Sequence, residues 1–559
     1  MLAAGAALPL AARAVAAQAA CDAQPIRSIQ ISTAWLPPVE EVPLPAWVRR
    51  LSRALHHRTR ESTVRHELLF TEGEPCEALR LEESARILRG HGYLRSAEIF
   101  ATPAVDSGVD VRVLARDDWS LRASVSVHGG DVRRFRLAEE NIAGRGIRLQ
   151  ARYVNFPFAN HPGFEVGVFH HQVFGHHDAE LLLGTSIVGP MAEQSVLRPF
   201  ESEFDRTAWR EAARYRKEPF FFRSTALGTV AQPLVSFGGD VGIAMRFGAP
   251  GRLRIVGVAL SGERLYIEGR PFSVEPANDS AAVAALAGRF TERRRVRAHL
   301  LLGARRLRFL KHGGLDAVNA LEDIRYGVEA GLTLGRTLAS GGGRQHDTFT
   351  AAELFVGRPV GGRWLVFARG KAEARYLEEE RRWDGVIAAG DLVTYHAVSE
   401  RGVVVVGLSG AGGWDTSTPF QLLLAGSSGI RGYGYSGLPV GRRVVAEAEH
   451  RYFLGTAFRA VDVGTVAFVD LARGWAGPAP FGEDIAFAGS VGGGLRLAFP
   501  SGSRVTYRLD LAVPLTRRGG FEVRLGLRQQ FGILRGEAED VTRSREQVSS
   551  VTVFNFPRY

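Results

Sequence analysis

In the last third of the chain, apolar and polar residues alternate with a period of two. In Val505–Val513 the odd-numbered residues are apolar or aromatic, while Arg508 and Asp510 fall on the opposite face. Gly494–Phe499 follows the same rule, and Phe521–Phe531 follows it except at Gln529, which interrupts the apolar face. Successive side chains of a β-strand point to opposite sides, so this period predicts strands with one apolar and one charged face.

The period of two begins near Trp119, which predicts a large all-β domain at 119–534. A membrane barrel presents apolar residues to lipid and charged residues to its lumen, whereas a soluble sandwich places its polar residues outside. Alternation alone fits both. The length accommodates a barrel of about 16 antiparallel strands of about 10 residues each, with the remainder in turns and long surface loops. The charged stretch 194–217 is interpreted as one of these loops.

Before the barrel, residues 22–116 predict a small α+β domain in the order β-α-α-β-β. The helices rest on apolar residues at helical spacing and end at glycine. The predicted elements are a strand at 26–32, helices at 63–70 and 78–90, and strands at 96–102 and 109–114.

The first twenty residues, Met1 to Ala20, are rich in alanine and leucine and end in an A-x-A-like cleavage site, so they predict a secretory signal peptide. Cys21 follows at once, which raises a lipoprotein anchor as an alternative, although Gln18 stands where an aliphatic residue is usual. Cys76 is the other cysteine. The pair allows one disulfide and excludes a cysteine-based metal site.

The formal net charge of +11 comes almost entirely from arginine, since lysine occurs only at Lys217, Lys311 and Lys371. No basic stripe with interleaved aromatic residues stands out, so no nucleic-acid partner is expected. Arginines that face a barrel lumen or anionic lipid explain the charge equally well. The mean hydropathy of −0.04 suits a barrel, because its strands present apolar residues to lipid only at every second position.

The most informative motif is the glycine-rich run at 426–433, which places Arg431 between Ile430 and Gly432 at the tip of a long loop. A charge in a confined lumen needs a partner, and the planar guanidinium suits carboxylates. The following strands offer Glu447 and Glu449 on one face, then Phe468 and Asp470 on one face of the next strand. Asp470 is the first predicted partner, and Glu449 or Glu447 the second. The predicted latch residues are Gly429, Arg431, Gly432 and Tyr433.

This loop resembles the Arg-Gly-aromatic loop tip of outer-membrane assembly and translocation barrels of the BamA, TamA and two-partner-secretion type. Phe468 and Asp470 are similar to the Phe-x-Asp-x-Gly strand motif of that superfamily, with Ala472 at the glycine position. The N-terminal module resembles a POTRA domain in the pieces around 66–73 and 81–93. Only one such module precedes the barrel here, and the tail 535–559 has no counterpart in the family pattern.

The resemblance implies a bacterial-surface-antigen-type barrel in the outer membrane, with its N-terminal domain in the periplasm and no cofactor. It implies unfolded outer-membrane or secreted polypeptides as clients, contact with outer-membrane lipid and lipopolysaccharide, and accessory assembly proteins. The expected function is insertion, assembly or translocation of polypeptides. The alternatives are a passive pore or receptor barrel, and a lipid-handling barrel without protein clients.

Other candidate chemistry is weaker. Four histidines (His170, His171, His176 and His177) surround a predicted turn, but such residues more often line a barrel rim than bind a metal, so no metal site is predicted. Ser427 and Ser428 lack a Gly-x-Ser-x-Gly elbow and an evident His/Asp pairing, so no enzymatic activity is predicted.

Overall fold

The computed structural model describes most of the chain outside the first twenty residues. The predicted signal peptide lies outside the described residues, and no described helix is long and apolar enough to cross a membrane. The described residues are 21–34, 50, 57–105, 107–128, 131–155, 162–273, 284, 286–340, 346–426, 429–434, 438–516, 520–527, 529, 532 and 536–545.

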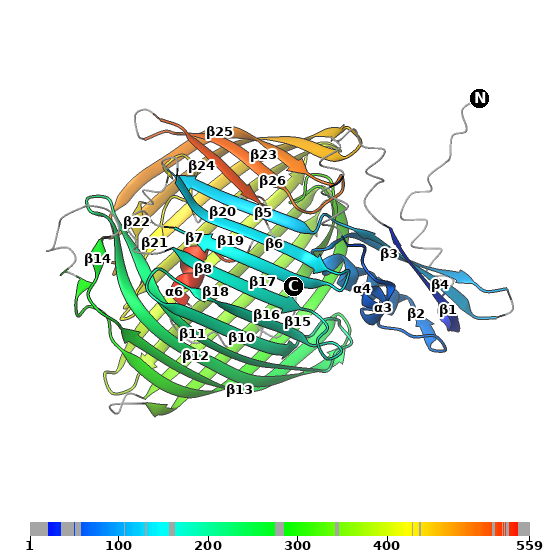
Figure 1. The fold of residues 1–559 in the computed structure, drawn as a ribbon, viewed down its shortest axis with the longest axis horizontal. Helices are drawn as coiled ribbons and strands as arrows, with labels where there is room; N and C mark the ends of the chain where they lie inside the picture. The colour runs from blue at the N-terminus through cyan, green and yellow to red at the C-terminus, as the bar shows by residue number, and fades with distance from the viewer. Residues whose placement is uncertain are drawn as a thin grey trace.

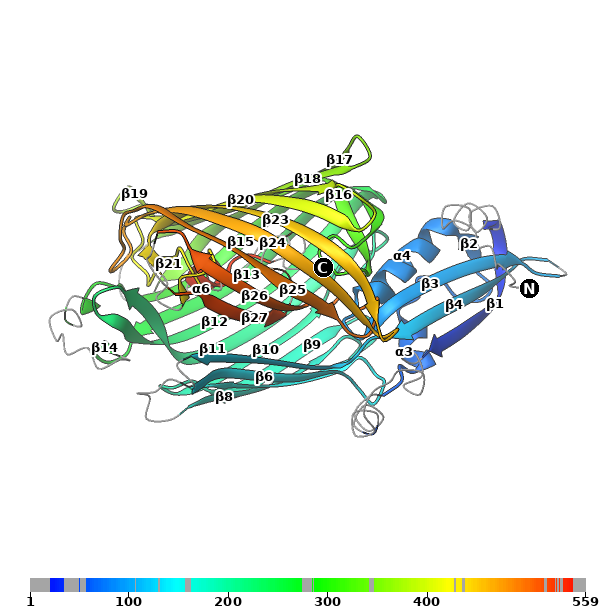
Figure 2. The ribbon, with the colours of Figure 1, turned by 90° about the horizontal axis from the view of Figure 1, so that it is seen from above.

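The N-terminal residues form a four-stranded sheet in the order β2-β1-β4-β3, covered by two helices (Figure 2). β1 runs parallel to β4, while the other two pairings are antiparallel. Ile29, Leu88 and Val111 belong to the apolar core between helices and sheet. The elements are β1 (Asp22–Ala34), α3 (Glu61–His66), β2 (Pro75–Glu77), α4 (Ala78–Gly90), β3 (Leu94–Pro103) and β4 (Val109–Asp117).

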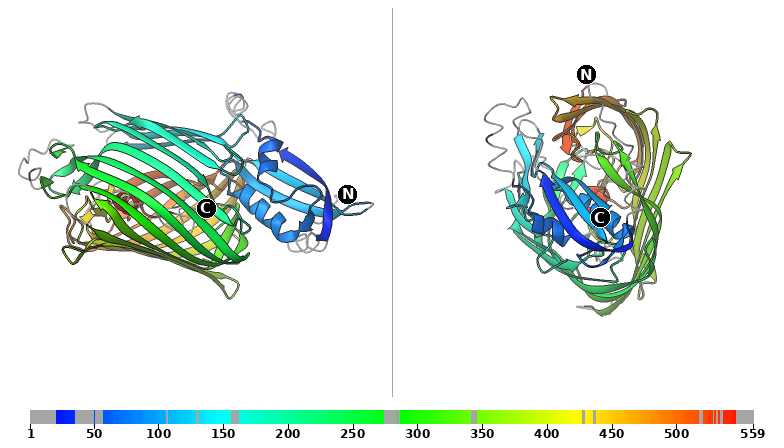
Figure 3. Two further views of the ribbon diagram at one scale, coloured as in Figure 1. Left: turned by 90° about the horizontal axis from the view of Figure 1, so that it is seen from below. Right: turned by 90° about the vertical axis from the view of Figure 1, so that its right-hand side faces the viewer.

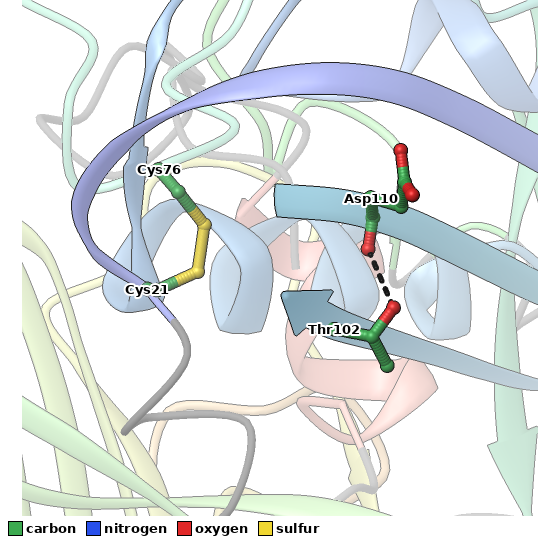
Figure 4. The surroundings of a disulfide bond; sticks show 4 residues. All are labelled: Cys21, Cys76, Thr102 and Asp110. Carbon is green, nitrogen blue, oxygen red and sulfur yellow. Dashed lines mark hydrogen bonds between the residues drawn. A yellow bond between two sulfur atoms is a disulfide. The ribbon is translucent and has the colours of Figure 1, made fainter. Parts of the chain in front are cut away.

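These elements follow the predicted order, with two differences. The helix expected at 63–70 ends at His66, and the three-residue strand β2 lacks any periodic signal in the sequence because it is so short. Cys21 and Cys76 form a disulfide that joins the start of β1 to β2 (Figure 4). The disulfide uses the sulfur of Cys21 that a lipid anchor would need.

The rest of the chain forms a large closed antiparallel barrel, which Figure 1 shows from the side. The described residues contribute 20 main strands, and the short strand β14 (Phe272–Ser273) pairs with β12. The main strands are β5 (Leu121–His128), β6 (Asp131–Ile142), β7 (Ile147–Val154), β8 (Gly163–His170), β9 (Asp178–Thr185), β10 (Pro190–Arg198), β11 (Thr207–Ser224), β12 (Gly228–Ala249), β13 (Arg252–Ile267), β15 (Arg293–Gly313), β16 (Leu321–Ser340), β17 (Asp347–Val360), β18 (Trp364–Leu377), β19 (Arg382–Ala397), β20 (Gly402–Trp414), β23 (Arg442–Ala457), β24 (Val461–Trp475), β25 (Ile485–Ala498), β26 (Tyr507–Pro514) and β27 (Glu522–Leu527).

The predicted number of about 16 strands is therefore too low. The segment 194–217, expected to be a surface loop, lies mostly in β10 and β11, which pair with each other from Met191–Arg216 to Arg198–Trp209. Charged and apolar residues are mixed along these strands. This mixture is typical of a barrel strand, which has one face towards the lumen and the other towards lipid. The strand estimate failed because it assigned such charged stretches to loops.

The burial of side chains is inverted relative to a soluble protein. Large apolar residues such as Val258, Leu354 and Leu511 are exposed on the outer surface, whereas Arg297, Asp347 and Asp510 are fully buried. An exposed apolar band of this extent marks a surface that contacts lipid. Of the two folds that fit the alternation, a membrane barrel and a soluble sandwich, the structure has the barrel.

The N-terminal domain packs against one end of the barrel, here called the near end, and the opposite end is called the far end (Figures 2 and 3). Arg89 of α4 makes a two-pronged pair with Asp323 of β16, at 2.6 and 2.7 Å. Arg504, in the turn after β25, donates to the carbonyls of His91 and Leu94 at 3.1 and 3.2 Å. Seen along the barrel, the domain overlies the near mouth (Figure 3, right).

Candidate functional site

The loop between β20 and β23 (residues 415–441) folds back into the lumen. Its two arms pair as the short strands β21 (Leu422–Leu423) and β22 (Pro439–Val440). Near its base, Ser417 donates to Asp384 at 2.7 Å. Further along, Gln421 accepts from the backbone N–H of Arg223 on β11 at 2.7 Å. The loop is thus tied to more than one face of the wall before it reaches its tip.

Arg431 lies at this tip and is fully buried. Its Nε and Nη2 donate to the two carboxylate oxygens of Asp470 at 2.8 and 2.6 Å, and its backbone N–H reaches the same carboxylate at 3.1 Å. Nη1 donates to Glu449 at 2.7 Å. The guanidinium carbon lies 3.5 Å from the ring centre of Phe468, which adds a cation–π contact. Carboxylates therefore pair with the edges of the guanidinium, and an aromatic ring covers its flat face.

The wall around Arg431 carries further charges of both signs. Asp510 of β26 approaches its Nη1 to 3.6 Å and pairs with Arg496 at 2.5 Å. Arg451 of β23 donates to Glu449 at 2.8 Å. Burial alone would lower the pKa of Arg431, but the hydrogen bonds to Asp470 and the charge of Glu449 outweigh it and raise that pKa. The arginine stays charged and paired.

The neighbours of Arg431 in the loop are fixed by close contacts. The N–H of Gly432 donates to Glu522 of β27 at 2.6 Å. Gly432 has φ +93°, a conformation that favours glycine. The hydroxyl of Tyr433 donates to the carbonyl of Gly489 at 2.8 Å and lies 2.6 Å from Thr516. An added Cβ at Gly429 would overlap the carbonyl of Leu424, so this position also requires glycine.

The structure brings together the residues that the sequence singled out. Gly429, Arg431, Gly432 and Tyr433 share one loop tip, with Asp470, Glu449 and Phe468 against the arginine. The charge of Glu447 also acts on Arg431 and helps to raise its pKa. We name this assembly the latch.

Sequence reasoning did not assign Asp510, Glu522 or Gly492 to the latch. Their positions in the alternating pattern place Asp510 and Glu522 on the lumen side of their strands. Their distance from Arg431, however, depends on how the strands pair, and the pattern within one strand does not predict that pairing. Gly492 lies opposite Phe468 in the β24–β25 pairing. A Cβ there would overlap the Phe468 ring and the Leu511 carbonyl, so this glycine makes room for the ring beneath Arg431.

The four histidines considered as metal ligands in the sequence do not form a metal site among the described residues. His171 and His176 lie in the near-end turn after β8, where His171 contacts the ring of His91 and His176 contacts that of His66. His177 packs against Trp209. Within the described ranges, no group of three or more histidine, cysteine, aspartate or glutamate residues could hold a metal ion. His171 and His176 instead belong to the contact with the N-terminal domain.

Of the C-terminal tail at 535–559, the structure describes residues 536–545. Residues 536–545 lie within the lumen, where helix α6 (Glu539–Arg545) packs beside the loop hairpin. Arg443 of β23 pairs with Asp540 through Nη1 and Nη2, the second at 3.0 Å. Burial would raise the pKa of Asp540, but the charge of Arg443 outweighs it and holds that pKa below its ordinary value. The carboxylate is therefore ionised at neutral pH.

No family model and no curated protein matches this sequence. Among solved structures, the chain is similar to BamA from Haemophilus ducreyi lacking POTRA domains 1–3, at 13% identity and a TM-score of 0.34, over 89% of this chain and 83% of that one. It is also similar to CdiB from Escherichia coli (12% identity, TM-score 0.41, 90% and 75% covered) and to CdiB from Acinetobacter baumannii (8% identity, TM-score 0.35, 83% and 73% covered).

The interpretation of the site rests on its own contacts. In its motif and in its solved neighbours alike, the chain is similar to barrels of the BamA type.

Proposed function

We propose that this protein is an outer-membrane barrel that inserts, assembles or translocates polypeptides, with residues 22–116 as a POTRA-like domain in the periplasm. The observation that carries the proposal is the latch. A long loop is folded into the lumen and held there by Arg431, Asp470 and Glu449, all fully or almost fully buried. A passive pore keeps a water-filled channel, whereas the lumen of this barrel is occupied by the loop.

The N-terminal domain supplies a place for a client to bind. β3 is an edge strand that pairs only with β4 among the described strands. Arg89 donates to the carbonyl of Ala97 at 2.9 Å, which covers the end of β3 close to the barrel. Glu98 and Thr102 are exposed beyond it. An extended peptide can add to such an edge through main-chain hydrogen bonds.

The seam of the barrel is a second place where a client would act. β27 has six residues, fewer than any other main barrel strand described, and it closes against β5. The described β26–β27 pairing covers Tyr507–Leu527 to Ala512–Glu522. We propose that sideways opening occurs at this seam, because a short strand forms few ladder hydrogen bonds.

Site-specific photo-crosslinking in cells tests the proposal. A photoreactive residue at Thr102, on the edge of the sheet, is expected to capture unfolded polypeptides during their synthesis. The matched control is Arg112, an exposed position on β4 that pairs with Gln30 of β1 on one side and with Phe100 of β3 on the other. Capture of lipid alone at Thr102 would favour a lipid-handling barrel. Equal capture of polypeptide at both positions would contradict edge binding.

The rival of a passive pore or receptor is tested by the same protein without residues 22–116. The proposal expects this truncation to abolish client assembly. Unchanged single-channel conductance together with unchanged growth and unchanged outer-membrane protein levels would support the passive barrel instead.

A further inference from the structure

The C-terminal residues 536–545 occupy the interior of the barrel. Figures 1 and 2, two perpendicular views, both show α6 enclosed by barrel strands. These residues form no strand pairing with the wall, so the barrel ladder closes without them. Hydrogen bonds and ion pairs to the loop and the wall attach them instead.

One end of the segment is held by the loop hairpin and β23. Asp540 pairs with Arg443 and also accepts from the backbone N–H of Leu423 at 2.9 Å. Val541 is buried in the apolar cluster that contains Leu422 and Val445. An acidic residue followed by an apolar one therefore fits this part of the lumen.

The other end is held by β18, which lies three places from β23 in the strand order of the barrel. Arg545 donates through Nη1 to Glu373 of β18 at 3.0 Å and through Nη2 to the carbonyl of Lys371 at 3.0 Å. Glu373 is almost fully buried, and Arg545 of the lumen segment neutralises its charge. The segment therefore runs along one side of the wall, from β23 to β18.

One flank of the segment is open. A cavity of about 300 Å³ separates it from the wall, and Gly536, Ala538 and Val541 form its side facing the segment. The wall side is charged and includes Glu353, Lys371 and Asp391. A polar cavity of this size holds water, so water already reaches the segment. The latch, by contrast, is enclosed on every side.

We propose that residues 536–545 are a removable plug, and that the lumen site holding them is a peptide-binding site. The site recognises an acidic residue, an apolar residue directly after it, and an arginine four positions further on, as in Asp540, Val541 and Arg545. At rest this segment of the chain itself occupies the site, and it leaves before a polypeptide passes. The inference rests on the proposed function in one respect, the placement of the barrel in the outer membrane. It does not require that the barrel handle polypeptide clients, because residues 536–545 occupy the lumen in either case.

Single-channel recording from the full-length protein in planar bilayers tests the plug. A chain that stops after residue 535 is expected to conduct about threefold or more above the full chain, since removing a helix about 10 Å across opens a water path. A synthetic peptide of residues 536–545 is expected to restore the low conductance. A peptide of the same composition in scrambled order is expected to have no effect.

Point variants guard against a folding defect of the truncation. Asp540→Asn combined with Arg545→Gln removes both anchoring charges and is expected to raise the conductance or the frequency of opening. The matched control is Glu82→Gln, which makes the same acid-to-amide change at an exposed position of α4, outside the lumen. The control is expected to conduct like the full chain. Heat-modifiable mobility in gels verifies that each barrel is folded.

Equal conductance of the folded truncation and the full chain would overturn the plug. A raised conductance that the specific peptide fails to reduce would overturn the peptide site. If the conductance responds as expected but the protein inserts no client into vesicles, the plug stands and the proposed function fails.

Discussion

At the scale of single residues, Arg431 shows how an arginine can be buried without loss of its charge. Taking a guanidinium out of water is costly unless carboxylates and hydrogen bonds replace the lost solvation. Asp470 supplies both of its oxygens, Glu449 supplies a third acceptor, and the Phe468 ring covers the flat face. The same dependence makes the site vulnerable, because loss of the arginine leaves two buried carboxylates unmatched.

Arg431→Ala is therefore expected to lower the level of folded barrel and its activity. Breaking a buried ion pair by removing one partner costs about 3 to 5 kcal/mol. Folded barrel is measured by heat-modifiable mobility, and activity by client assembly in cells. The control is Arg473→Ala, which removes an exposed arginine from the outer face of β24, the strand that carries Asp470. Normal mobility together with normal client assembly in Arg431→Ala would disprove the role of the latch.

Gly492→Val is expected to disturb the latch without altering any charge. Its side chain would overlap the Phe468 ring, so the ring must move away from Arg431. Gly410→Ala is the control, since its added Cβ meets only the Arg443 carbonyl at 3.8 Å. Protease accessibility of the 415–441 loop in folded barrels measures the effect. A loop equally protected in Gly492→Val and the wild type would show that the ring is dispensable.

The sequence predicted much of this site, because parity along a strand is a local property. Asp470 and Glu449 could be assigned to the lumen from alternation alone. Asp510 and Glu522 have the same parity, but they reach the loop tip only through the registers of β25, β26 and β27. Register depends on pairing between strands, which a single sequence does not reveal.

At the scale of elements, the interface between the N-terminal domain and the barrel is polar and specific. The pair between Arg89 and Asp323 is two-pronged, a geometry that fixes orientation as well as adding energy. His176 of the turn after β8 lies 3.2 Å from Glu201 of the next near-end turn and 5.2 Å, between ring centres, from His66 of α3. Individual charged and polar contacts thus hold the domain against the barrel.

Asp323→Asn is expected to weaken docking of the domain, since hydrogen bonds to charged groups contribute about 1.5 to 3 kcal/mol. Hydrogen exchange of α4 and the near-end turns in the full-length protein is the measurement. Faster exchange is expected in Asp323→Asn but not in Glu82→Gln, which alters an exposed acid on the same helix. Equal exchange in Asp323→Asn and the wild type would show that the pair does not hold the domain.

The same interface is expected to respond to pH through His176. The hydrogen bond to Glu201 raises the pKa of His176 above its ordinary value of 6.5, helped by the charges of Glu201, Glu67 and Asp205 and opposed by partial burial. A histidine whose pKa is raised on folding stabilises the folded state below 6.5, and this contribution is lost as the pH rises through the higher, folded value.

The stability difference between the wild type and His176→Gln should therefore be larger at pH 6 than at pH 8. Thermal unfolding of the full-length protein at both values measures it, with His177→Gln as the control for loss of a neighbouring ring. A difference that grows towards pH 8 would contradict the assigned direction.

The strand count illustrates what element-level prediction misses. β12 and β15 are 22 and 21 residues long, about twice what a bilayer requires of a strand. Conversely, β5 to β9 are short or weakly alternating, and the charged segment at 194–217 resembles a loop by composition. Only the requirement that the barrel close brings these strands into the count.

At the scale of the whole molecule, one set of contacts joins the N-terminal domain to the latch. The turn after β15 folds inwards, where Glu322 accepts hydrogen bonds from the backbone N–H groups of Leu315, Asp316 and Ala317. The next residue, Asp323, meets Arg89 of the N-terminal domain.

From the same turn, Asp316 and the Leu315 carbonyl meet Arg451 at 3.0 and 2.8 Å, and Arg451 in turn pairs with Glu449 of the latch. The domain that is proposed to receive a client and the loop inside the barrel are therefore connected by a series of ion pairs and backbone hydrogen bonds. Such a path arises from three distant parts of the chain, so no local sequence pattern could indicate it.

The most direct test of the account is client insertion by purified protein in lipid vesicles. The full chain and Arg431→Ala, both verified as folded barrels, are each supplied with an unfolded outer-membrane client. The account predicts protease-protected, folded client in vesicles with the full chain, and a clear loss with Arg431→Ala. Client insertion by the full chain no greater than by empty vesicles, or full insertion by folded Arg431→Ala, would contradict it.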